Sequence, residues 1–224
     1  MILKNYYGCI CFISLIILLF IFIALYLKNV RFVESFDNKN INIVLAGDSI
    51  FDNKEYVILG ESVEQNLKNN GHDVLLLAKD GAFVADLVHQ LEKMPSNLNT
   101  PDTRLFISVG GNDILYKYRD TKFIDEKEIN SVLEQYKNNI LSIKNRFNIK
   151  IYLTNIYYPP LDKYVRLHKV IRYWNNEQKK FAKKNNISLF NIDTLVTEII
   201  HFSNEIEPSE IGSKLIADGI TNII

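Results

Sequence analysis

The chain has 224 residues with 26 basic and 26 acidic side chains, so its formal net charge is zero. This balance argues against a protein that binds the phosphate backbone of nucleic acids, because such a protein needs a basic surface. Hydrophobic residues make up 47% of the chain and charged residues 23%, which excludes a disordered chain and is typical of a globular protein. The length allows one domain with an appendage.

The N-terminal part of the chain is dominated by an apolar segment. Residues 9–27 contain neither a charge nor a proline. About 19 residues of helix span nearly 30 Å, which is the thickness of the hydrocarbon core of a bilayer. Residues 25–28 offer no small-x-small cleavage site, so we expect an uncleaved signal anchor rather than a cleaved signal peptide or a buried core helix. Residues 1–8 would then be a flank and residues 28–40 a stalk.

The residues around this segment leave its orientation open. Lys4 precedes it, and Lys28 and Arg31 follow it, so the positive charges are nearly balanced across it. We expect a single-pass membrane protein whose globular domain is extracytoplasmic. Both cysteines, Cys9 and Cys11, lie inside the segment, so the rest of the chain has neither a disulfide nor a thiolate metal site.

Residues 41–224 alternate between strand and helix patterns. Continuous apolar runs that end in polar or glycine residues predict buried parallel strands, and apolar residues at every third or fourth position predict helices. The expected fold is α/β, a three-layer α/β/α sandwich with right-handed crossovers. In chain order we predict strands at 41–46, 73–78, 104–109, 150–154 and 188–192, and helices at 61–70, 82–93, 129–147, 167–181 and 211–223.

Polar and glycine-rich residues follow three of these predicted strands, at positions 47–49, 80–81 and 110–113. Ligands of an open parallel sheet bind beyond the carboxyl ends of its strands, so these residues should meet in one crevice. A serine hydroxyl, glycine N–H groups and an asparagine amide are the components of an acyl-transfer site, because the serine supplies a nucleophile and the donors hold the developing oxyanion.

Four stretches of the sequence resemble the SGNH/GDSL hydrolase family. They are GDSI at 47–50, Gly81, SVGGND at 108–113 and EPSEIGSKLIADGI at 207–220, and the resemblance spans about residues 41–224. It implies a flavodoxin-like sheet of five parallel strands in the order 2-1-3-4-5. It also implies that Ser49 is the nucleophile, and that the oxyanion hole is formed by the N–H groups of Ser49 and Gly81 together with the side chain of Asn112.

The last block departs from the family pattern, which reads Asp-x-x-His-Pro. Alignment on Pro208 places Asn204 at the aspartate position and Glu207 at the histidine position. Three interpretations stay open. Glu207 is itself the general base, which requires burial to raise its pKa. Alternatively, Glu198 and His201 supply a displaced acid-x-x-His pair, or the site binds its ligand without turnover.

The sequence therefore predicts a membrane-anchored serine esterase or acyl hydrolase that acts on a lipid or carbohydrate ester, with Ser49, Glu207 and His201 as candidate catalytic residues. The alternative is a non-catalytic protein of the same fold that binds a glycan or lipid. We expect no cofactor, and no spacing of His, Asp and Glu indicates a metal site. The loops at residues 52–60 and 157–164 are expected to line the substrate pocket.

Overall fold

A sheet of five parallel strands forms the centre of the fold. The computed structural model describes residues 41–118 and 126–224. The strands lie in the order β2-β1-β3-β4-β5, which confirms the predicted parallel sheet and its strand order. They are β1 (Asn42–Gly47), β2 (Asp73–Leu76), β3 (Thr103–Ser108), β4 (Lys150–Thr154) and β5 (Ser188–Phe190).

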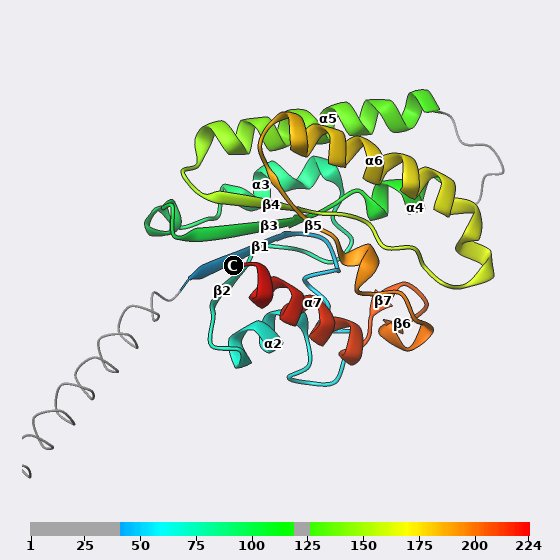
Figure 1. The fold of residues 1–224 in the computed structure, drawn as a ribbon, viewed down its shortest axis with the longest axis horizontal. Coiled ribbons are helices and arrows are strands. Elements are labelled where there is room, and N and C mark those ends of the chain that lie inside the picture. The colour runs from blue at the N-terminus through cyan, green and yellow to red at the C-terminus, as the bar shows by residue number, and fades with distance from the viewer. Residues whose placement is uncertain (1–40, 119–125) are drawn as a thin grey trace, which may run out of the picture. The chain divides into compact units, whose positions relative to one another are not determined.

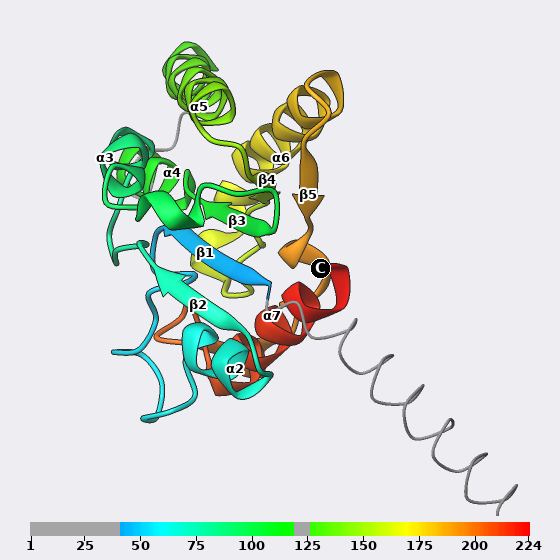
Figure 2. The same cartoon turned by 90° about the vertical axis from the view of Figure 1, so that its left-hand side faces the viewer.

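Helices connect the strands and cover both faces of the sheet. The α-helices are α2 (Val63–Asn69), α3 (Leu87–Leu91), α4 (Gly111–Tyr118), α5 (Glu126–Arg146), α6 (His168–Lys184) and α7 (Glu210–Ile223). Helices α3, α4, α5 and α6 lie on one side of the sheet and α2 and α7 on the other, as Figures 1 and 2 show from two directions.

Shorter elements complete the fold. The two-residue strands β6 (Phe202–Ser203) and β7 (Glu207–Pro208) pair antiparallel just before α7. Short 3₁₀ helices are η1 (Val84–Asp86), η2 (Ser96–Leu98), η3 (Asp162–Leu167), η4 (Ile192–Thr194) and η5 (Ile199–His201).

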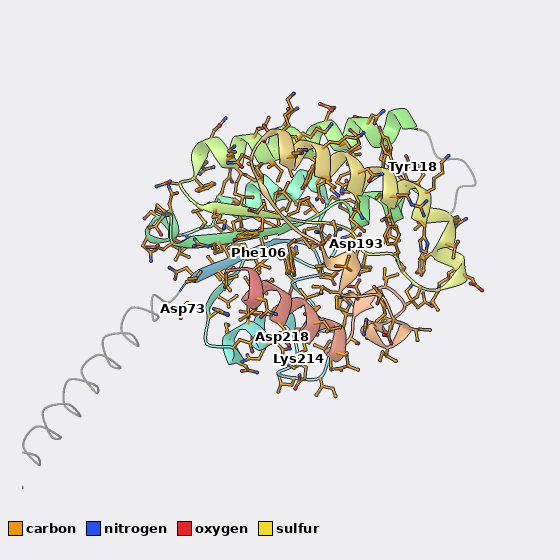
Figure 3. All side chains as sticks on the ribbon, in the orientation of Figure 1. Asp73, Phe106, Tyr118, Asp193, Lys214 and Asp218 are labelled. Carbon is orange, nitrogen blue, oxygen red and sulfur yellow. The ribbon has the colours of Figure 1, made fainter. Side chains whose placement is uncertain are left out.

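The apolar core consists of two clusters, one on each face of the sheet. The cluster beneath α7 is organised by Phe106 of β3, which stacks on Tyr152 with ring centroids 4.6 Å apart and meets Phe190 edge-on at 5.7 Å. Figure 3 shows Phe106 in the middle of the fold, whereas Lys214 and Asp218 lie on α7, where they form an ion pair at 3.0 Å. The polar side of α7 therefore faces solvent while its apolar side packs on the sheet.

The helix predicted at residues 82–93 is shorter and begins differently. The N–H of Phe83 donates to the side chain of Asp86 and caps the turn, and the N–H of Val84 donates to Asp113 of α4. The result is one 3₁₀ turn, η1, followed by the five residues of α3. Helix α4 was not predicted, because its glycine-rich start is typical of a turn.

The membrane prediction concerns residues that the structure does not describe. The flank at 1–8, the apolar segment at 9–27 and the stalk at 28–40 all lie outside the described ranges. Within residues 41–118 and 126–224, no helix combines the length and the apolar character needed to cross a bilayer.

Candidate active site

Ser49 lies at the carboxyl edge of the sheet, in a turn fixed by backbone contacts. Gly47 ends β1 with φ +128°, and a Cβ atom there would come within 1.8 Å of the carbonyl oxygen of Ser108, so only glycine fits. Both backbone groups of Gly47 are bound by the buried side-chain amide of Gln90, at 2.7 and 2.8 Å. Gln90 therefore fixes the backbone just before Ser49, and Ser49 itself is 6% exposed.

Asp48 is a buried carboxyl group beside Ser49. Its Oδ1 accepts hydrogen bonds from the N–H of Ile50 at 3.2 Å and from the hydroxyl of Ser108 at 3.0 Å. The pKa of Asp48 is raised from 3.8 to about 8, mainly by burial; the hydrogen bonds from Ile50 and Ser108 partly offset this rise, and the charge of Glu207 adds to it. Asp48 therefore holds the turn, and it does so mainly in its neutral form at pH 7.

The side chain of Asn112, at the start of α4, lines the same cavity as Ser49. Its Nδ2 atom donates one hydrogen bond to the carbonyl oxygen of Ala82 at 2.9 Å, and a second N–H of this amide remains for a ligand. Asp113 accepts from the N–H of Val84 at 3.0 Å. Helix α4 thus fixes the loop after β2 to the edge of the sheet where Ser49 lies.

Gly81 lies in this same loop, with φ +75°. Its neighbours on both sides are bound, since the N–H of Asp80 donates to Asp52 at 3.0 Å and the carbonyl of Ala82 accepts from Asn112. Gly81 is not among the residues that line the cavity around Ser49. Its role as an oxyanion donor therefore stays a prediction.

Glu207, in β7, lies in the cavity with Ser49 and is 9% exposed. Burial raises the pKa of the Glu207 carboxyl, the charge of Asp80 adds to this rise, and a hydrogen bond from the Ser49 side chain partly offsets it. Its Oε2 atom is buried and has no hydrogen-bond partner within the described part of the chain. The arrangement places a serine hydroxyl beside a carboxyl group whose pKa is raised.

Asn204 and His201 are not brought to this cavity. Asn204 is exposed, in the turn between β6 and β7, at φ +44°. His201 is buried, and its Nδ1 accepts the N–H groups of Thr197 and Glu198, both at 3.1 Å. The Glu198–His201 pair thus caps its own 3₁₀ turn, and an imidazole engaged in this way is not placed to accept a proton from Ser49.

The backbone of His201 positions the segment that carries Glu207. Its carbonyl oxygen accepts the N–H of Ser209 at 2.9 Å, and a Cβ atom at Gly212 would come within 2.2 Å of the same oxygen. The beginning of α7 can therefore approach this turn only with glycine at position 212. Ser209 also caps α7 through the N–H of Gly212.

Two further side chains that sequence reasoning missed hold this segment. Asn53 is fully buried and donates to the hydroxyl of Ser213 at 2.6 Å and to the carbonyl of Pro208 at 3.4 Å. The hydroxyl of Tyr157 donates to the carbonyl of Ile206, the residue before Glu207. Neither contact had a signal in the sequence, because each joins single polar residues that are far apart along the chain.

The cavity itself has a volume of about 50 Å³ and is largely aliphatic. Of the two loops expected to line it, the loop at 157–164 contributes Tyr157 and Pro159, whereas residues 52–60 contribute none. The loop at 52–60 lies against β6 and Asp80 instead, through hydrogen bonds of Tyr56. It therefore supports the segment that carries Glu207 from outside the cavity.

Several solved structures share this fold. A member of the lipolytic G-D-S-L family from Veillonella parvula has a TM-score of 0.64 and 20% identity, covering 82% of this chain and 97% of that one. The lipase Lip_vut3 from a goat rumen metagenome has a TM-score of 0.66 and 17% identity, covering 81% of this chain and 96% of that one. A catalytic mutant of Axe2, an acetylxylan esterase from Geobacillus stearothermophilus, has a TM-score of 0.62 and 16% identity, covering 81% of this chain and 92% of that one.

A comparison with curated proteins gives no match. The family model described as GDSL-like Lipase/Acylhydrolase matches residues 43–220, which include Ser49, the loop around Gly81, Asn112 and Glu207. With the sheet order and the turn around Ser49, this match shows that the chain belongs to the GDSL-like lipase/acylhydrolase family.

Proposed function

We propose that this protein is a serine ester hydrolase in which Ser49 is the nucleophile and Glu207 the general base. The observation that carries the proposal is the placement of the Ser49 side chain beside the buried carboxyl group of Glu207, close enough to influence its pKa, in a cavity that Asn112 also lines. Nucleophile, base and a candidate oxyanion donor thus surround one space, which is the geometry that acyl transfer requires.

The chemistry needs only groups of this chain. Glu207 takes the proton of the Ser49 hydroxyl as Oγ attacks the ester carbonyl, and the oxyanion forms against the Asn112 amide and the N–H groups of Ser49 and Gly81. When the tetrahedral intermediate collapses, Glu207 gives this proton to the departing alcohol. Water then attacks the acyl-serine ester while Glu207 accepts a proton from the water, and Glu207 returns this proton to Oγ of Ser49 as the bond between Oγ and the acyl group breaks and the acid leaves.

The raised pKa of Glu207 supports its role as a base. A carboxylate with an ordinary pKa of about 4.3 is a poor acceptor for a serine proton at neutral pH. Burial and the nearby charge of Asp80 both disfavour the ionised carboxylate and so make it more basic. The neutral form of Asp48 limits the negative charge that the oxyanion meets in the same space.

Labelling by a fluorophosphonate tests the proposal. The probe should modify Ser49 covalently, the unmodified protein should hydrolyse p-nitrophenyl acetate, and Ser49→Ala should abolish both. Ser108→Ala is the matched control, because Ser108 is also a buried serine at the end of a strand but donates its hydroxyl to Asp48. A protein that neither reacts with the probe nor hydrolyses the ester would instead be a binding protein of this fold.

We also propose that residues 9–27 anchor the chain in a membrane, with the hydrolase domain on the extracytoplasmic side. The support is the sequence, in which these residues carry no charge and match the thickness of a bilayer. The chain should stay in the membrane fraction during alkaline extraction. An added protease should digest the domain from the outer side of intact cells, and digestion only after lysis would reverse the orientation.

A further inference from the structure

The cavity beside Ser49 continues into the apolar core between the sheet and the helices α4 and α6. Its inner wall includes Ile114, Leu167 and Ile171, which are only 1%, 2% and 3% exposed. Leu115 of α4 and Ile156, which follows β4, line it as well and are half-buried. The space therefore starts at a reactive hydroxyl and ends against branched aliphatic side chains.

Most polar groups in the lining are already bound by the protein. The Ser108 hydroxyl donates to Asp48 at 3.0 Å. The amide of Asn155 donates to Asn191 at 3.4 Å and accepts the N–H of Asp193 at 3.2 Å. Tyr157, too, uses its hydroxyl to bind a backbone carbonyl. A sugar or another polyol would lose hydrogen bonds with water here and gain few in return, which excludes it from the inner part of the cavity.

We propose that this cavity binds the acyl chain of the substrate, and that the protein prefers esters of acids with roughly four to six carbons over acetate esters. This inference rests on the proposed function and adds the substrate class. A cavity of about 50 Å³ is well above the roughly 10–15 Å³ that is needed to hold one water molecule, so it has room for more than one group of that size, such as a methylene. An acetyl group would leave most of this space empty.

The position of the base assigns the cavity to the acid part of the ester rather than to the alcohol. Glu207 must reach the oxygen of the departing alcohol, and that alcohol must leave the protein while the acyl group stays on Ser49. A space closed by buried residues suits the free end of a hydrocarbon chain, which can be inserted and then covered. The alcohol part therefore faces solvent and contributes less to selectivity.

The test is a chain-length series. The full chain, in one buffer and one detergent throughout, is assayed with p-nitrophenyl esters of acids of two, four, six, eight and ten carbons. Each methylene group buried in an apolar pocket should raise kcat/KM about fourfold. The value of kcat/KM should therefore rise from the acetate ester to about the five-carbon ester and then level off or fall. A series that falls from acetate onward would overturn the inference, although the proposed function would stand.

Leu115 is the residue to change, because it is half-buried and tolerates a change of size better than the inner wall. Leu115→Trp should lower the ratio of hexanoate to acetate kcat/KM by at least tenfold, and Leu115→Ala should move the optimum toward longer chains. Leu98→Ala is the matched control, since Leu98 packs on the same core without lining the cavity. The control should keep the wild-type chain-length profile, and an equal change in all three variants would contradict the inference.

A binding measurement covers the case in which no ester is hydrolysed. Unbranched primary alcohols of two to eight carbons are neutral mimics of the acyl chain. They should raise the melting temperature more with each carbon up to about five, and Leu115→Trp should abolish this rise while Leu98→Ala keeps it. No hydrolysis with this binding pattern would refute the proposed function alone, and no chain-length dependence of binding would refute the acyl cavity.

Discussion

The side chain of Ser49 lies in one cavity with the carboxyl group of Glu207, which occupies the position where the family pattern has a histidine, and close enough to influence its pKa. Ser49 follows the first strand of the sheet, and Glu207 lies immediately before the last helix. No imidazole lies between them, so a single carboxylate has to act as both base and acid in the proposed reaction. Its environment, rather than a third residue, must then supply the required basicity.

Glu207→Gln should lower kcat for p-nitrophenyl acetate by roughly 10²–10⁴-fold, because the amide cannot accept the serine proton. Glu205→Gln is the matched control two residues away, where the carboxylate is half-exposed and binds Lys163 and Tyr164. The control should keep nearly all activity. Equal activity of Glu207→Gln and the wild-type protein would exclude Glu207 as the base.

His201→Ala tests the displaced-pair interpretation. The imidazole caps its own turn, so the variant should lose stability yet keep most of its kcat when assayed well below its melting temperature. Circular dichroism at the assay temperature would verify that the variant is folded. A loss of kcat as large as that expected for Glu207→Gln, in a folded variant, would move the base to His201.

The pH dependence of kcat/KM should report the raised pKa of Glu207. The base acts in its ionised form, so kcat/KM should rise with pH through an apparent pKa above the 4.5 of an ordinary glutamate. Asp80→Asn removes a negative charge that raises this pKa, and the rising limb should move to lower pH. Asp218→Asn, on the outer side of α7, should leave the limb where it is. Superimposable profiles for all three proteins would contradict the electrostatic account.

Asp48 should make the protein less stable as pH rises. The pKa of Asp48 is about 8 in the folded protein and 3.8 in the unfolded chain. Between these values, the folded protein holds a proton that the unfolded chain has released. The stabilisation is complete below about pH 4 and is lost between about pH 4 and 8, by up to roughly 1.4 kcal/mol per pH unit. Asp48→Asn should remove this dependence of the free energy of unfolding on pH, which urea unfolding at pH 5, 6.5 and 8 measures. The same dependence on pH in the wild-type protein and in Asp48→Asn would contradict this role of Asp48.

Gly110→Ala should cost about 2–4 kcal/mol of stability. Gly110 has φ +110°, and a Cβ atom there would come within 2.4 Å of Trp174 Cζ2 in the core. Gly111→Ala is the neighbouring control, because its Cβ atom would approach only Asp48 Oδ2, at 3.9 Å. Chemical denaturation should show a large loss for the first variant and a change within about 1 kcal/mol for the second. Equal losses would mean that the contact with Trp174 is relieved by local movement.

Residues 36–224 expressed alone should give a folded domain that needs no detergent. The sheet, both apolar clusters and the cavity described above are built from residues 41–224. Near-ultraviolet circular dichroism and a cooperative thermal transition would verify folding, and the full chain serves as the control. Aggregated or unfolded material would place the boundary of the domain nearer the N-terminus.

The sequence predicted the framework well because its signals are local. Each strand is a continuous apolar run, and the residues at strand ends carry the GDS and GGND patterns, so Ser49 and Asn112 were placed on one edge correctly. Helix α4 escaped prediction because two glycines and two short polar residues favour a turn. It forms nonetheless because Ile114 is 1% exposed and packs in the core beside the cavity.

The remaining features depend on contacts that no local pattern encodes. The spacing of Glu198 and His201 imitates an acid-x-x-His pair, but both serve a cap of their own turn. Gln90 resembles a surface residue of an amphipathic helix, yet it binds both backbone groups of Gly47. Such single polar residues acquire their role only from the tertiary fold, which is why sequence reasoning did not find them.

The bond between Asn53 and Ser213 has a consequence for synthesis of the protein on the ribosome. It is fully buried and joins residues separated by 160 positions. During translation Ser49 and Asn53 emerge from the ribosome long before the segment with Glu207 and its anchor Ser213 on α7. A nascent chain therefore cannot assemble the proposed site until this segment has emerged, and a premature stop codon anywhere before the segment yields a protein that lacks the proposed base.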